Sequence, residues 1–89
     1  MIGSFKDRKL KQLYEAGDRS KLAPEHIEKI LARLEAAATI GDMNLPGFHL
    51  HPLQGDLGGV WSVTVRANWR IIFRFENGTA LDVELTDYH

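Results

Sequence analysis

An α+β fold is the class that this sequence predicts, because helical and strand periodicities occupy different halves of the chain. In the first half, apolar residues recur every three or four positions, as they do along one face of a helix. From Phe48 onward, apolar and polar residues alternate, which is typical of strands with one buried face. We therefore expect two N-terminal helices packed on one face of a mainly antiparallel sheet of four or five strands, within one domain that spans residues 1–89.

The composition is that of an ordinary globular domain, with 44% hydrophobic and 26% charged residues. Cysteine is absent, so neither a disulfide framework nor a cysteine-based zinc site is expected. No apolar run approaches the roughly 20 residues of a membrane span, and the first residues lack the layout of a secretion signal. We expect a cytoplasmic protein that makes no membrane contact and needs neither a metal nor another cofactor.

A short edge strand at residues 2–4 and a short first helix are predicted at the start of the chain. Leu10, Leu13 and Tyr14 recur at helical spacing, and Gly17 supplies a stop signal.

The second predicted helix has clearer signals. Pro24 suits the first helical position, and Glu25 favours the positive end of the helix dipole. The helix is expected to end near Thr39, before Gly41 and Asp42. One apolar stripe follows its length: Ile27, Ile30, Leu31, Leu34 and Ala38.

The second half predicts a sheet with one apolar face and one polar face. The apolar face is made of odd-numbered residues: Trp61, Val63, Val65, Trp69, Ile71, Phe73, Phe75, Leu81, Val83 and Leu85. The polar face carries Ser62, Thr64, Arg70, Arg74, Asp82 and Glu84, interrupted by Ile72. The segment before Pro52 is expected to present His49 and His51 on the polar side, which is cationic at its centre.

Parity constrains the turns, because residues that oppose each other in an antiparallel pair face the same side. An Asn-Gly dipeptide at 77–78 suggests a two-residue hairpin loop, but that loop would set Phe73 opposite Asp82. A three-residue loop over 76–78 pairs Phe73 with Leu81 instead, and we therefore predict the longer loop.

The same argument predicts a three-residue turn over 66–68, which pairs Val65 with Trp69 and Thr64 with Arg70. The two loops together place Arg70 in the middle of the polar face, opposite Glu84 on its other side. A guanidinium in an apolar strand is costly unless it faces water, a carboxylate or a phosphate. An ion pair with Glu84 and a phosphate contact are both open at this point.

The candidates for chemistry are His51, Arg70, Asp87, Tyr88 and His89. Imidazole exchanges a proton near neutral pH, and two histidines near one phosphate could share the acid and base roles. The last three residues follow directly from a core strand, whereas a disposable tail is usually small and polar. A metal site at His49 and His51 is not favoured, because only one further histidine, His89, is expected nearby.

Three ordered blocks of residues resemble the HigB family of the RelE toxin superfamily, over essentially the whole chain. The blocks are Leu50-His51-Pro52-Leu53-Gln54-Gly55-Asp56, then Gly59 to Ile71 (GVWSVTVRANWRI), and finally Asp87-Tyr88-His89. The resemblance implies a compact RelE-like domain, and a toxin of a type II toxin–antitoxin system. It also implies a ribosome-dependent endonuclease that cuts mRNA in the decoding site, through attack of a ribose 2'-hydroxyl on the adjacent phosphate.

By this resemblance, His51, Asp87, Tyr88 and His89 match catalytic residues, and Arg70 matches a phosphate-facing arginine. We assign charge stabilisation to Arg70, proton transfer to His51 or His89, and orientation to Asp87 and Tyr88.

The resemblance implies three partners: a HigA-like helix-turn-helix antitoxin, the ribosome and mRNA. The net charge is −1, but residues 1–21 carry six basic against three acidic groups, so attraction to RNA must be local. The expected contacts with RNA or the ribosome are Lys6, Arg8, Lys9, Lys11, His49, Arg66 and Arg74.

Two features depart from the family pattern. Gln54 stands where relatives often carry lysine, and the sequence pI of about 6.4 is low for a ribosome-binding toxin. Both predict a weaker attraction to RNA. Two alternatives therefore stay open: a ParE-like inhibitor of DNA gyrase, and a catalytically inactive module that only binds an antitoxin.

Overall fold

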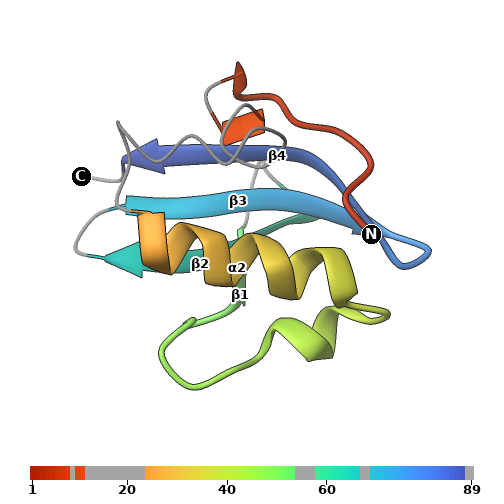
Figure 1. The fold of residues 1–89 in the computed structure, drawn as a ribbon. Helices are drawn as coiled ribbons and strands as arrows, with labels where there is room; N and C mark the ends of the chain where they lie inside the picture. Colours follow the sequence, from red (N-terminus) through yellow and green to blue (C-terminus); the bar gives the residue numbers. More distant parts are fainter. Residues whose placement is uncertain (9, 12–23, 54–57, 67–68, 88–89) are drawn as a thin grey trace.

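Four antiparallel strands form one sheet, and a helix lies along one of its faces (Figure 1). The computed structural model describes residues 1–8, 10–11, 24–53, 58–66 and 69–87. The strands follow chain order across the sheet: β1 (His51–Pro52), β2 (Val60–Arg66), β3 (Trp69–Glu76) and β4 (Thr79–Asp87). The helices are α2 (Pro24–Ala36) and the short 3-10 helix η1 (Ile40–Met43). The α+β class and the antiparallel sheet are confirmed.

The first residues run along the outer edge of β4. Parallel bridges join Ile2 to Ala80 and Phe5 to Val83, so the predicted edge strand exists as two isolated bridges. The backbone then turns into a helix, in which Lys11 N donates to the carbonyl oxygen of Asp7 at 3.1 Å. The remainder of the predicted first helix lies outside the described residues.

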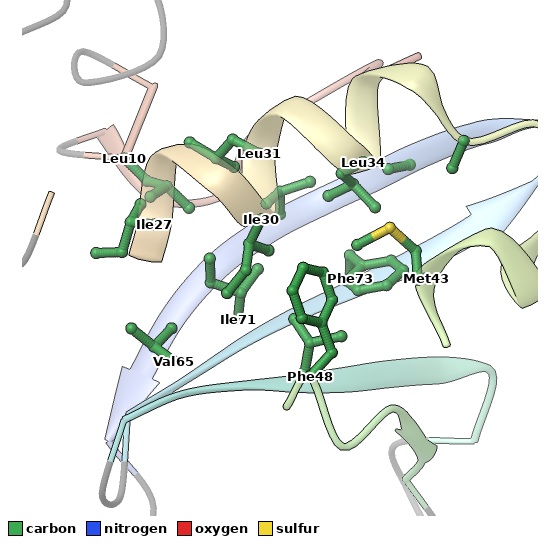
Figure 2. Close-up of a cluster of buried hydrophobic side chains, with 14 residues drawn as sticks. Leu10, Ile27, Ile30, Leu31, Leu34, Met43, Phe48, Val65, Ile71 and Phe73 are labelled. Atoms are coloured by element: carbon green, nitrogen blue, oxygen red, sulfur yellow. The ribbon is translucent and has the colours of Figure 1, made fainter. Parts of the chain in front are cut away.

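The helix α2 buries four residues of the predicted apolar stripe against the sheet, Ile27, Ile30, Leu31 and Leu34 (Figure 2). Side chains of Ile27, Ile30 and Leu34 point from α2 towards Ile71 and Phe73 of β3. All five are at most 2% exposed. Burial of each such side chain stabilises the fold by roughly 1.5–3 kcal/mol, and this packing leaves the opposite face of the sheet for other contacts.

α2 ends at Ala36, earlier than the predicted Thr39. The Asp42 carboxylate accepts hydrogen bonds from the backbone N–H groups of Ala38 and Thr39, at 2.9 and 3.0 Å. These N–H groups are thereby directed to η1 instead of continuing α2. The predicted stripe residue Ala38 is exposed as a result, and Ala37 is buried in its place.

The turn between β3 and β4 has two residues, so the predicted three-residue loop is wrong. Glu76 pairs with Thr79, and the intervening Asn77 and Gly78 both have positive φ, at 52° and 76°. This is the conformation that an Asn-Gly hairpin turn favours, because its twist matches that of the flanking strands. The local preference of the dipeptide therefore decides the turn.

A β-bulge at Asp82 restores the parity that the short turn shifts. Asp82 has a φ of 54°, and the register changes between Ile72 and Arg74. Before the bulge, Phe75 pairs with Ala80, which is fully buried. Leu81, predicted on the apolar face, consequently pairs with Arg74 and stays partly exposed.

Beyond the bulge, Ile71 pairs with Leu85 and Arg70 pairs with Thr86. The predicted pairing of Arg70 with Glu84 is therefore wrong, whereas the predicted pairing with Thr64 is confirmed.

At the other end of this hairpin, a second irregularity between Thr64 and Arg66 pairs Trp69 with Arg66. The predicted pairing of Trp69 with Val65 is therefore wrong. Trp69 was expected in the core and is 44% exposed. In the described part of the chain, no helix has the length and apolar character needed to span a membrane.

Candidate functional site

Arg70 lies on β3, at the centre of a row of three paired residues from β2, β3 and β4. The row is on the face of the sheet that α2 does not cover. Arg70 is directly opposite Thr64 on β2 and Thr86 on β4. Its neighbour Ile71 is fully buried on the α2 side, so alternation along β3 directs Arg70 to the other side. Arg70 Nη1 donates a hydrogen bond to Thr64 Oγ1 at 2.5 Å. The guanidinium is therefore partly buried and held by a neighbouring strand.

His51 occupies β1 on the same face, because it pairs with Ser62 and Ser62 pairs with Ile72. The histidine is exposed, and its Nδ1 lies 3.3 Å from the carbonyl oxygen of His49. When Nδ1 carries the ring proton, it donates to that oxygen and leaves Nε2 as an acceptor. This arrangement suits a general base.

His49 precedes β1 and is also exposed, with a φ of 50°. Its carbonyl oxygen, which lies outside the strand, is the backbone acceptor that faces His51 Nδ1. The strands β1 and β3 are roughly 10 Å apart, since neighbouring strands are separated by about 4.8 Å. A phosphodiester and its two flanking nucleotides span a distance of this order, so His51 and Arg70 can engage the same segment of RNA.

The end of β4 lies beside Arg70. Thr86 opposes Arg70, and Asp87, the last residue of the strand, opposes Trp69. Tyr88 and His89 lie outside the described residues, as do Lys9 and Gln54. The backbone thus brings Asp87 to the Arg70 end of the sheet, whereas His51 and Arg70 are the predicted catalytic residues whose side chains are described on one face.

The predicted cationic residues occupy separate places. Arg66 ends β2. Arg74 Nε lies 3.8 Å from Asp82 Oδ2, in an ion pair whose side chains are 46% and 58% exposed. The bulge therefore places a carboxylate beside Arg74, which is a predicted RNA contact.

The basic N-terminal residues Lys6, Arg8 and Lys11 are exposed along the β4 edge. They are separated by the width of the sheet from His51 on β1 (Figure 1). The charge-rich segment and the candidate catalytic histidine consequently lie at opposite edges.

Ser62 is buried although the sequence places it on the polar face. It has no exposed surface, and its Oγ makes no hydrogen bond within the described part of the chain. On the predicted polar face, Ser62 and Val60 are therefore buried, whereas Thr64 and Arg70 are partly exposed to solvent. Sequence periodicity missed this division, since it assigns one character to a whole strand face.

The described residues contain no group of three or more His, Cys, Asp or Glu side chains placed to hold a metal ion. What they bring together is a held guanidinium and an accessible imidazole on one sheet face. A guanidinium binds and neutralises a phosphate, and an imidazole moves a proton near neutral pH. The arrangement suits chemistry on a phosphodiester.

Comparison with known sequences extends over the whole chain. Residues 3–89 match the family described as RelE-like toxin of type II toxin–antitoxin system HigB. Endoribonuclease HigB of Proteus vulgaris is 48% identical over 92 residues, which cover 100% of both chains. Toxin HigB-1 of Vibrio cholerae serotype O1 is 38% identical over 90 residues, covering 96% of this chain and 95% of that protein.

Solved structures of toxins share the fold. A point mutant of YafQ from E. coli superposes with a TM-score of 0.67 at 17% identity, covering 98% of this chain and 91% of its own. The YoeB/ParE toxin from Agrobacterium tumefaciens superposes with a TM-score of 0.59 at 16% identity, covering 99% and 96%. These structures establish the fold, and the sequence relatives establish the family. The chain belongs to the HigB-like family of RelE-like toxins of type II toxin–antitoxin systems.

Proposed function

We propose that this toxin is an endoribonuclease that cuts mRNA in the decoding site of the ribosome and thereby blocks translation. The observation that carries the proposal is Arg70, held by Thr64 on the open sheet face that also presents His51. The Proteus vulgaris relative, 48% identical over the full length, is named an endoribonuclease, which supports the same activity here.

In the proposed reaction, a ribose 2'-hydroxyl attacks the adjacent phosphorus while a base removes its proton. A P–O bond forms to the 2'-oxygen, the P–O bond to the 5'-oxygen breaks, and an acid protonates that leaving oxygen. The products are a 2',3'-cyclic phosphate and a 5'-hydroxyl. The reaction therefore requires a base, an acid, and a positive charge that stabilises the pentacoordinate phosphorane-like transition state.

We assign the positive charge to Arg70 and the two proton transfers to His51 and His89, in an order that is open. The contact between His51 Nδ1 and the His49 carbonyl favours His51 as the base, because it leaves Nε2 as the acceptor. Asp87 and Tyr88 are assigned to orientation of substrate or histidine. Asp87 ends β4 opposite Trp69, one position beyond the row of Arg70.

We further propose that the ribosome and mRNA are partners, and that a HigA-like helix-turn-helix antitoxin inhibits the toxin. Ribosomal RNA is assigned to the exposed Lys6, Arg8 and Lys11, together with Lys9. His49, Arg66 and Arg74 are assigned to the mRNA or its surroundings. The net charge of the chain is −1, but residues 1–21 carry six basic and three acidic groups. This segment can therefore attract phosphate locally.

The test is to map the 5' ends of cellular mRNA shortly after the toxin is induced, with Arg70→Ala beside the wild type. Wild-type cuts inside translated codons, absent in Arg70→Ala, are expected. Arg33→Ala is the matched control, since Arg33 is an exposed arginine on α2, across the sheet from Arg70. The loss from Arg70→Ala is expected to be about 10²–10³-fold in rate.

The alternatives give different results. Intact messages with induction of the DNA-damage response would identify a gyrase inhibitor, and intact messages without any growth defect would identify an inactive antitoxin-binding module. A purified reaction with programmed ribosomes, compared with naked mRNA, tests the ribosome dependence. Equal cleavage of both substrates would contradict it.

A further inference from the structure

We infer that Thr64 is a positioning residue for the proposed reaction, and that its hydroxyl holds the Arg70 guanidinium in the orientation that meets the phosphate. The inference rests on the proposed function. Thr64 and Arg70 are directly opposed in the β2–β3 ladder, and Arg70 Nη1 donates to Thr64 Oγ1 at 2.5 Å. Both side chains are partly buried, so water competes less for this bond than it would at an exposed site.

Thr64 is itself held in place from a second direction. Its backbone N–H donates to the carbonyl oxygen of Phe48 at 2.7 Å, and Phe48 is 4% exposed in the core. A β-branched side chain is also stiff at χ1 in a strand. The acceptor for Arg70 therefore belongs to a rigid element, which is what a preorganised site requires.

The second threonine in the row provides a natural comparison. Thr86 opposes Arg70 from β4 and is also partly buried, yet the hydrogen bond from Nη1 goes to Thr64. The two residues share chemistry and cross-strand position relative to Arg70. Thr64→Val and Thr86→Val each remove a threonine hydroxyl beside Arg70, but only Thr64→Val removes the acceptor of the Nη1 hydrogen bond. A difference in cleavage rate between the two variants therefore measures the effect of that bond.

The consequence for catalysis follows from the flexibility of arginine. A free arginine side chain samples many rotamers, whereas a guanidinium bonded through one Nη has a defined plane. Charge stabilisation is effective when the donors are already oriented before the transition state forms. Loss of the Thr64 hydroxyl should lower the rate of the chemical step and leave ribosome binding unchanged.

The kinetic test is single-turnover mRNA cleavage on saturating ribosomes with Thr64→Val, Thr64→Ser and Thr86→Val. Valine keeps the shape of threonine without the acceptor, and serine keeps the acceptor. We expect Thr64→Val to lose about ten- to a hundredfold in rate, the effect of one lost hydrogen bond to a charged group, with Thr64→Ser and Thr86→Val within about threefold of wild type. Thermal melts and ribosome cosedimentation should be alike for all of them.

A double-mutant cycle isolates the pair. In an Arg70→Ala background, Thr64→Val should cause no further loss, because the group that it positions is gone. A similar loss in both backgrounds would overturn the inference, as would a Thr64→Val protein that cuts at the wild-type rate.

A readout independent of activity separates this inference from the proposed function. In the wild type, the Nη signals of Arg70 in ¹⁵N NMR should be resolved by slow rotation about the guanidinium bonds. The Nη1 signal should shift in Thr64→Val, because its acceptor there is lost, and should stay as in the wild type in Thr86→Val. Unchanged Nη signals in Thr64→Val would overturn the positioning role even for an active toxin. A wild type that cuts no mRNA would overturn the proposed function, and the NMR result would still decide the positioning of Arg70.

Discussion

The side-chain hydroxyl of Ser4 accepts a hydrogen bond from the backbone N–H of Asp82, at 2.9 Å and across 78 positions of sequence. Asp82 is the residue at which β4 bulges, with a φ of 54°. A bulge leaves a backbone donor outside the ladder, where it needs an acceptor from another segment or from water. Ser4 satisfies it, so the N-terminal segment stabilises the register that places Thr86 opposite Arg70.

Ser4→Ala should destabilise the protein by about 0.5 kcal/mol, because the exposed Asp82 N–H exchanges the Ser4 hydroxyl for water. The measurement is urea unfolding, in which the midpoint should fall while the slope stays the same. Ser4→Thr keeps the hydroxyl and is the control. Equal midpoints for Ser4→Ala and the wild type would show that this hydrogen bond does not stabilise the bulge.

Ser62→Ala should have the opposite sign. The Ser62 hydroxyl is fully buried and makes no hydrogen bond in the described part of the chain, so its removal relieves a desolvation cost of roughly 1 kcal/mol. The expected result is a higher unfolding midpoint with unchanged mRNA cleavage. A destabilised Ser62→Ala protein would contradict this and indicate a partner for the hydroxyl.

Charge reversal of Lys6 and Lys11 should weaken ribosome association and leave the cleavage rate on saturating ribosomes unchanged. Both lysines are exposed along the β4 edge, away from His51 on β1. Cosedimentation across a salt series should show a smaller salt dependence, because fewer phosphate contacts remain. The matched control reverses Lys29 and Arg33, which are exposed on α2. Equal losses in the two double variants would argue against a dedicated basic segment.

His51→Gln and His89→Gln should each lower the cleavage rate by about 10²–10⁴-fold, as expected for general acid–base residues. Neither substitution should change the melting temperature. His51 is exposed, and Val83, a buried core residue of β4, lies six positions before His89 in the sequence. Removal of Tyr88 and His89 should likewise abolish cleavage. Full activity in the shortened protein would eliminate a catalytic chain end, and activity lost together with folding would make it structural.

Asp42 predicts a pH dependence of stability. Backbone hydrogen bonds from Thr39 and Ala38 lower the pKa of Asp42 below its ordinary value of 3.8. A lowered folded-state pKa means that the carboxylate stabilises the fold above the unfolded-state pKa, and that this contribution is lost as pH falls through the folded-state pKa. The difference in melting temperature between wild type and Asp42→Ala should therefore shrink between about pH 7 and about pH 3. A constant difference would contradict the role of the charged form.

The sequence by itself determined the α+β class and the buried α2 stripe from Ile27 to Leu34. These depend on local periodicity, because a helix or strand that faces one core repeats its apolar residues at a fixed spacing. The three motif blocks also identified the family, which the match over residues 3–89 confirms. The catalytic roles of His51, Arg70, Asp87, Tyr88 and His89 remain predictions. Of these residues, His51 and Arg70 have described side chains, and both lie on one face of the sheet.

Only the tertiary structure decided the β3–β4 register, the burial of Ser62 and the end of α2. Parity between regular strands favours a three-residue loop over the two-residue Asn-Gly turn. The chain instead keeps the turn and bulges at Asp82, whose backbone N–H donates to the hydroxyl of the distant Ser4. Asp42 similarly ends α2 through hydrogen bonds to Ala38 and Thr39. Periodicity cannot reveal such choices, because each depends on whether one particular polar group meets a partner once the chain has folded.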